Sequence, residues 1–181
     1  SEPGCLLTSE YTMAGVVDPR KPDSDTRTYR VFTLPNELQV VVCSDPETQS
    51  AAAALAVSAG QLQDPPEVQG CAHFLEHMLF LGNEKYPGES DFDSFCASSA
   101  GYSNAWTSMD RTVYHYVLAH DKLQDSLDRF SGFFSCPLFT EDLTDRELNA
   151  IDSENNKNLQ DDGRREFQLL RSTSKSAHPL Q

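Results

Sequence analysis

The sequence predicts an α+β domain in which helices cover a largely antiparallel sheet. Two β-rich runs near the start, residues 28–33 and 38–43, frame turn-forming residues at 34–37 and so predict a hairpin. A second pair of strand-like runs, residues 102–107 and 111–118, is joined by a short polar turn. Helical patterns lie between and after these pairs instead of alternating with single strands, which is typical of α+β domains.

The segments around the first hairpin are less regular. Residues 1–27 are rich in Pro, Asp, Ser and Thr without a sustained period, so we expect an irregular N-terminal extension before a domain at 28–181. The small apolar residues at 50–58 predict a buried third strand. Residues 60–66 should form a loop, since their two closing prolines cannot continue a strand.

Glycine, proline and capping residues set the expected helix boundaries. A helix at residues 68–81 should end at Gly82, and a second should begin at Ser90 or Asp91 and run to about Ala100.

The second half of the chain predicts further helices. Residues 121–135 are amphipathic and precede Pro137. Thr140 should cap a long helix to about Leu159, and Gly163 should interrupt it before a last helical stretch to about Ser174.

Composition limits the partners. Acidic residues outnumber basic ones 28 to 14, a formal charge of −14, which disfavours nucleic acid and anionic membranes as partners. No apolar run is long enough to span a bilayer, and the opening residues do not resemble a signal peptide. The five cysteines are widely spaced without a CxxC pair, so we expect a reducing, intracellular location in the cytoplasm.

The chemistry is expected in residues 70–81, a helical pattern that is apolar nearly all round and is therefore predicted to be buried. His73 and His77 lie one turn apart on one face, where both imidazoles can point at one cation such as zinc. Glu76 lies beside them and can take a proton from a metal-bound water. This is the HxxEH motif. A satisfied structural His–Glu cluster is the alternative, and the apolar setting weighs against it.

A catalytic zinc needs a third protein ligand and an open position. His115, His120 and His178 are candidates, but their settings suggest a sheet-face residue, a helix cap and a tail residue respectively. Glu147 and Glu154 lie two turns apart on one face of a predicted helix, so that one could ligate the metal and the other could hold a ligand. A solvated charged face remains the alternative for this pair.

These segments together resemble the pitrilysin/insulysin family of HxxEH zinc metallopeptidases, and its insulysin members most closely. The resemblance runs from about Tyr29 to the end of the chain. The matching stretches are residues 70–82, 85–87, 101–108, 127–130, 136–139 and 145–154.

The resemblance implies one zinc ion per chain, held by His73, His77 and Glu154, with Glu76 as general base. It makes Glu147 a catalytically important carboxylate that supports the ligands. It also implies that an edge strand containing Asn104, Ala105, Trp106 and Thr107 pairs with the backbone of an extended peptide.

Members of that family have four related domains that form a closed chamber, and this chain resembles most of the first, truncated at its C-terminal end. We therefore expect a zinc metalloendopeptidase whose partners are peptide substrates and the remaining domains, with oligomers allowed. The rival hypotheses are a non-catalytic subunit, of the kind found in mitochondrial processing assemblies, and a piece that is inactive or only binds when taken alone.

Overall fold

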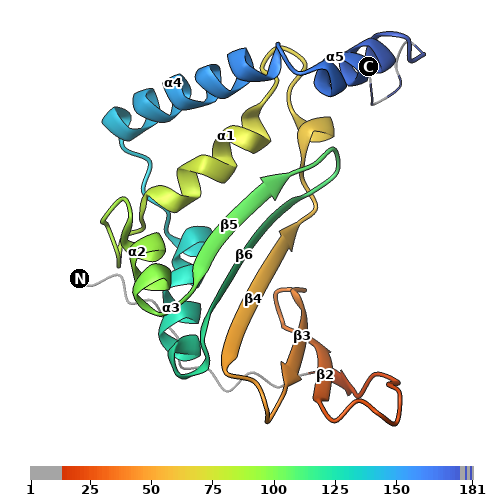
Figure 1. Ribbon diagram of the computed structural model, residues 1–181, viewed down its shortest axis with the longest axis vertical. Helices are drawn as coiled ribbons and strands as arrows, with labels where there is room; N and C mark the ends of the chain where they lie inside the picture. Colours follow the sequence, from red (N-terminus) through yellow and green to blue (C-terminus); the bar gives the residue numbers. More distant parts are fainter. Residues whose placement is uncertain (1–13, 176–177, 179, 181) are drawn as a thin grey trace. The chain divides into compact units, whose positions relative to one another are not determined.

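The computed structural model describes residues 14–175, 178 and 180, and it divides the chain into two compact units, residues 1–48 and 49–181. The first unit contains a three-stranded antiparallel sheet of order β1-β2-β3 (Figure 1). Its strands are β1 (Ala14–Val17), β2 (Thr28–Thr33) and β3 (Gln39–Ser44). The predicted hairpin is confirmed as β2–β3. Strand β1 lies within residues 1–27, for which the sequence predicts no regular element. Its four residues are too few to show a period in the sequence.

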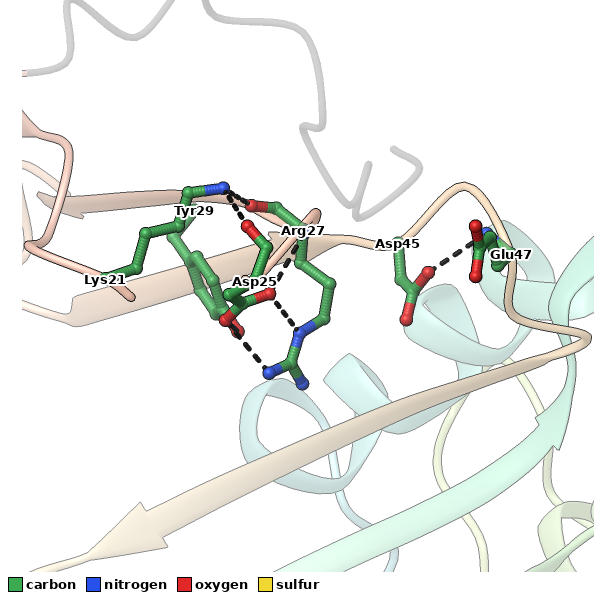
Figure 2. Close-up of polar contacts among 6 residues, drawn as sticks. All are labelled: Lys21, Asp25, Arg27, Tyr29, Asp45 and Glu47. Atoms are coloured by element: carbon green, nitrogen blue, oxygen red, sulfur yellow. Dashed lines mark hydrogen bonds and ion pairs between the residues drawn. The ribbon is translucent and has the colours of Figure 1, made fainter. Parts of the chain in front are cut away.

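A polar cluster organises the segment that leads into β2 (Figure 2). The Asp25 carboxylate accepts hydrogen bonds from Arg27 Nε at 2.8 Å and Nη2 at 3.0 Å, and from the Tyr29 hydroxyl at 3.0 Å. Lys21 Nζ donates to the Asp25 carbonyl at 2.8 Å. The Arg27 side chain holds the pKa of Asp25 well below its usual range, and burial followed by the Asp25 bond raises the pKa of Tyr29 to about 12.

The second unit contains a separate three-stranded antiparallel sheet of order β4-β6-β5. Its strands are β4 (Ser50–Val57), β5 (Tyr102–Thr107) and β6 (Thr112–Ala119). The central strand β6 alternates, with Tyr114, Tyr116 and Leu118 buried under the helices. The prediction that 50–58 forms a buried strand is only half right. β4 lies at an edge of this sheet, and its alternate residues are exposed because the helices cover one face of the sheet. The sequence does not show this alternation, because the run of alanines has no polar–apolar period.

Helices α1 (Cys71–Met78), α2 (Asp91–Ser98) and α3 (Leu123–Ser135) pack on that sheet. Short 3₁₀ turns η2 (Leu79–Leu81) and η3 (His120–Lys122) continue α1 and precede α3. The core is largely aromatic; its buried members are Leu79, Phe92, Cys96, Tyr114, Tyr116, Leu118, Phe130 and Phe133. Figure 1 shows α1 lying between the sheet and α4 (Glu141–Asn158), and α1 contacts both α4 and β5.

Helix α1, which carries the HxxEH motif, differs from the sequence prediction at its start and in its burial. It begins at Cys71, because Gly70 takes a left-handed conformation with φ 98°. The Asp64 carboxylate accepts from the backbone N–H groups of Gly70 and Ala72, both at 2.8 Å, and so satisfies donors at the helix start. Leu75 is 46% exposed, so the expectation of burial on all sides is wrong for the face that carries it.

The last helices form as predicted, with one shifted boundary. Thr140 occupies the N-cap position of α4 without a side-chain hydrogen bond. The break before α5 (Asp162–Ser172) falls at residues 159–161 and not at Gly163, because the Asp161 side chain accepts from Arg164 N and starts the new helix. In the described residues, no helix is both long and apolar enough to cross a membrane.

Candidate metal centre

Helix α1 places its two histidines one turn apart, with their rings facing a common point. The ring centroids of His73 and His77 are 4.8 Å apart at an interplanar angle of 90°, and their Nε2 atoms are 3.2 Å apart. Both side chains are partly buried, at 35% and 23% exposure. Two basic nitrogens this close need a proton or a cation between them.

Helix α4 brings a carboxylate to the same point. Glu154 Oε2 lies 3.7 Å from His73 Nε2 and 3.9 Å from His77 Nε2. Donor atoms about 2.1 Å from a tetrahedral zinc lie about 3.4 Å from one another. The three separations of 3.2, 3.7 and 3.9 Å lie close to that value, so two imidazoles and one carboxylate fit a catalytic zinc with an open fourth position.

Glu147, two turns earlier on α4, lies on the other side of His77. Its Oε2 is 3.1 Å from His77 Nδ1, and its side chain is 16% exposed, against 51% for Glu154. An ionised carboxylate only accepts hydrogen bonds, so Nδ1 of His77 must carry the proton. The Nε2 lone pair of His77 is then free to point at the metal position.

Glu76 lies beside the two histidines and is the most buried acid of the site, at 8% exposure. Its Oε2 accepts a hydrogen bond of 2.5 Å from the Thr107 hydroxyl on β5. Its charge also acts on the core: burial, and then the Glu76 carboxylate, raises the pKa of Tyr114 to about 12.

These groups line one open cleft of about 490 Å³. Its walls include His73, His77, Glu76, Glu147 and Glu154, together with Ser103, Asn104 and Ala105 from β5. The structure therefore brings the five titratable residues singled out in the sequence to one place.

Strand β5 forms one wall of the cleft and is an edge strand of its sheet within the described residues. Its exposure alternates: Asn104 and Trp106 are exposed, whereas Ala105 and Thr107 turn toward the helices. Trp106 is 45% exposed and does not line the cleft, and neither does Thr107. Of the four residues predicted to bind peptide, two therefore lie at the cleft and one contacts Glu76.

The remaining histidines lie elsewhere. His115 is on the face of β6 opposite Tyr114 and Tyr116, where its ring contacts Tyr102 at 6.4 Å between centroids. His120 starts η3, and Nδ1 of His178 accepts from Leu180 N. Among the described residues, His73, His77 and Glu154 form the one group whose ligand atoms could share a metal ion.

Two parts of the site were missed in the sequence. The Asp64 cap reaches across six to eight residues from a loop to the helix start, and the Thr107–Glu76 hydrogen bond joins residues 31 positions apart. Neither has a local signal, because Asp64 reads as a loop acid and Thr107 as an ordinary strand residue. Only the register of β5 against β6 and the packing of β5 beside α1 bring Thr107 to the carboxylate.

Known proteins are similar to this chain in sequence and in fold. The chain is 48% identical over 159 residues to the A-factor-processing enzyme of Saccharomyces cerevisiae and 48% identical over 160 residues to the insulin-degrading enzyme of Homo sapiens. Each alignment covers 88% of this chain and 16% of the relative, so the chain spans about a sixth of their length. The crystal structure of pitrilysin matches with a TM-score of 0.84 and 34% identity, over 92% of this chain and 18% of that one.

The likeness to pitrilysin confirms the predicted α+β fold. The family model described as insulinase, peptidase family M16, matches residues 39–177, which include both helices of the candidate metal centre. With an HxxEH helix, a carboxylate-bearing partner helix and this extent of match, the chain belongs to the insulinase family of peptidases, family M16.

Proposed function

We propose that this chain carries the zinc site and general base of a metalloendopeptidase that hydrolyses peptides and small proteins. The observation that carries the proposal is the convergence of His73 Nε2, His77 Nε2 and Glu154 Oε2 from two separate helices. Membership of a peptidase family supports the reaction class.

In this proposal His73, His77 and Glu154 hold one zinc ion, and Glu147 fixes the ring of His77. Bound zinc would polarise the scissile carbonyl and lower the pKa of a bound water. Glu76 takes the proton of the attacking water and passes it to the departing amine. The low exposure of Glu76 suits this role, because a shielded carboxylate exchanges its proton with substrate in preference to solvent.

Peptides would bind in extended form along the edge of β5, from Asn104 to Thr107. An unpaired strand edge offers backbone donors and acceptors that bind without regard to side-chain sequence. Asn104 and Ala105 line the cleft that contains the metal ligands, which supports this placement. The peptide would then lie beside Glu76.

The proposal assigns the chain to a larger enzyme whose remaining domains complete the substrate chamber. The chain spans 16% of the length of its relatives, which supports that assignment. We also propose an intracellular, cytoplasmic location: the described cysteines, Cys43, Cys71, Cys96 and Cys136, are free thiols, which is typical of a reducing compartment.

Metal analysis of Glu154→Gln tests the ligand set. The wild-type protein should hold about one zinc per chain, and the variant should lose at least about tenfold in zinc affinity, because a neutral amide is a poor zinc ligand. Glu141→Gln makes the same change at an exposed position of the same helix and should keep the metal. Equal zinc in all three proteins would place the third ligand elsewhere.

Glu76→Gln tests the base. The full-length variant should keep its zinc but lose about a hundredfold or more in kcat on a quenched peptide, because no carboxylate remains to take the proton. Normal turnover by this variant would overturn the assignment of Glu76.

A further inference from the structure

The hydroxyl of Thr107 is directed at the carboxylate of Glu76 from the neighbouring strand. The Thr107 Oγ1 to Glu76 Oε2 distance is 2.5 Å, in the range of a charge-assisted O–H···O bond. An ionised carboxylate has no proton to give, so Thr107 is the donor. The other carboxylate oxygen, Oε1, accepts no hydrogen bond from the described part of the chain and remains for another donor.

Thr107 is itself held in place by the end of the β5–β6 hairpin. Thr107 pairs with Thr112 in the strand register, and their hydroxyl oxygens are 3.3 Å apart. The Thr112 hydroxyl donates to the carbonyl of Ala59 at 2.9 Å, and Thr112 is buried at 4% exposure. These two donations, from Thr107 to Glu76 and from Thr112 to Ala59, use the single proton of each hydroxyl, so the contact between the threonines is a packing contact and not a hydrogen bond. The pairing of β5 with β6 and the buried, bonded Thr112 beside it hold Thr107 next to Glu76.

The loop next to this hairpin tightens the arrangement. The N–H groups of Gln61 and Leu62 donate to the carbonyls of Ser108 and Met109 at 3.0 and 2.8 Å. A Cβ on Gly60 would lie 2.4 Å from the Ser108 carbonyl oxygen, so only glycine allows this approach. The residue after Thr107 is therefore clamped by backbone contacts.

We propose that Thr107 is a positioning residue that fixes the orientation of the Glu76 carboxylate, with Oε2 bonded to the threonine and Oε1 turned to the attacking water. This inference rests on the proposed function of Glu76 as the general base. It gives the side chain of Thr107 a role distinct from the backbone pairing expected of its strand. A single residue then sets both the edge that receives the peptide and the angle of the base.

The test uses Thr107→Val and Thr107→Ser in the full-length, zinc-loaded protein with a quenched peptide. Val has the shape of Thr without the hydroxyl, so kcat should fall about tenfold to a hundredfold, the loss expected for a hydrogen bond to a charged group. KM and zinc content should stay within about twofold of wild type. Ser restores the donor and should recover most of the lost kcat.

Two comparisons separate positioning from a general structural effect. In a Glu76→Gln background, Thr107→Val should cause no further loss, because it acts through a carboxylate that is no longer there. Thr144→Val makes the same change on α4, where the hydroxyl, among the described residues, bonds only to the carbonyl of Thr140 at 2.8 Å, and should leave kcat unchanged.

The outcomes are distinct. If the wild type hydrolyses peptide and Thr107→Val has the same kcat, with or without a higher KM, the positioning role is overturned. The proposed function then stays intact. A Thr107→Ser variant as slow as Thr107→Val would also overturn the positioning role. This comparison decides the question even if the Val variant folds poorly, because Ser keeps the hydroxyl. A zinc-loaded wild type that hydrolyses no peptide would overturn the proposed function, and this inference with it.

Discussion

Two carboxylates on one helix contact the same histidine through different atoms. Glu147 meets Nδ1 of His77 at 3.1 Å and is largely shielded, whereas Glu154 approaches Nε2 at 3.9 Å from a half-exposed position. The first distance is that of a hydrogen bond; the second is too long for one and leaves room for a metal ion between the atoms. Sequence spacing puts both acids on one face, but only these atomic distances distinguish the proposed supporting residue, Glu147, from the proposed ligand, Glu154.

Asp128 gives a residue-level test of pH dependence. Its carboxylate accepts from Lys85 Nζ at 2.5 Å and from the Tyr86 hydroxyl at 2.6 Å, and the Lys85 bond is the main cause that lowers the pKa of Asp128. A lowered pKa means that the folded protein binds this proton less readily than the unfolded chain. The stabilisation by the ion pair is therefore fully present at pH values above the ordinary carboxyl pKa of about 4. It is lost as pH falls through the lower pKa that Asp128 has in the folded protein.

Asp128→Asn should lower the melting temperature by about 2–4 °C at pH 7, and the difference from wild type should shrink as pH falls below about 4. Thermal unfolding followed from pH 7 to pH 2.5 checks this. Asp145→Asn, an exposed acid with no ion pair in the described residues, is the control and should shift the melting temperature little at any pH. A gap that stays constant with pH would exclude the ion pair as its cause.

At the scale of elements, type and order could be predicted from the sequence because local signals set them. The β2–β3 hairpin, strands β5 and β6 and helices α1 to α4 lie within a few residues of their predicted bounds. Boundaries set by distant partners could not be predicted. The Asp64 carboxylate reaches eight residues along the chain to the start of α1, and β1 is a strand only because β2 pairs with it.

The candidate site divides in the same way. The i, i+4 spacing of His73 and His77 fixes their relation within one helix, so the sequence predicts it directly. The approach of α4 to α1 depends on tertiary packing, and the sequence alone leaves Glu147 and Glu154 as either ligands or a solvated face. The sequence predicts that residues 121–135 are amphipathic but does not fix which apolar residues of α3 face the core: Phe130 and Phe133 are buried, whereas Leu127 is 45% exposed.

Gly132 tests how closely α3 packs against the turn that follows η2. A Cβ at this buried position would lie 2.4 Å from the side-chain nitrogen of Asn83. Asn83 is 2% exposed, and its Oδ1 accepts from the N–H groups of Lys85 and Tyr86 at 3.1 and 2.9 Å. Gly132→Ala should therefore lower the free energy of unfolding by about 1–3 kcal/mol, despite the better helix propensity of alanine.

The matched control is Gly163→Ala, a second helical glycine. There, within the part of the chain that the structure describes, an added Cβ would meet only the Asp161 side chain at 3.4 Å. Without a clash, alanine should leave the unfolding free energy unchanged or raise it by up to about 1 kcal/mol. Denaturant unfolding of both variants measures the contrast, and equal stabilities would show that Asn83 yields without cost.

For the molecule as a whole, the proposed metal ion has a structural consequence. The second unit has an aromatic core built from residues of β6, η2, α2 and α3, whereas α4 contributes no buried residue. Helix α4 nevertheless packs on α1, and its contacts there include the pairs of Glu147 and Glu154 with the two histidines. A zinc ion bound by residues from both helices would tie α4 to the rest of the unit.

Removal of zinc should therefore loosen α4 before it affects the core. A ligand that binds only the state with α4 docked, at a free concentration of about 100 times its Kd, lowers the population of the undocked state about a hundredfold. Chelation of the zinc should therefore speed amide exchange in α4 by up to that factor. Amides of β6 and α3 should exchange at unchanged rates, because their burial does not depend on the metal. Hydrogen exchange followed by mass spectrometry, with and without chelator, resolves these segments. In Glu154→Gln, the amides of α4 should exchange as fast as those of the chelated wild type. Addition of chelator to this variant should change that exchange rate little. If α4 in the wild type exchanges equally fast with and without zinc, the metal does not link the two helices.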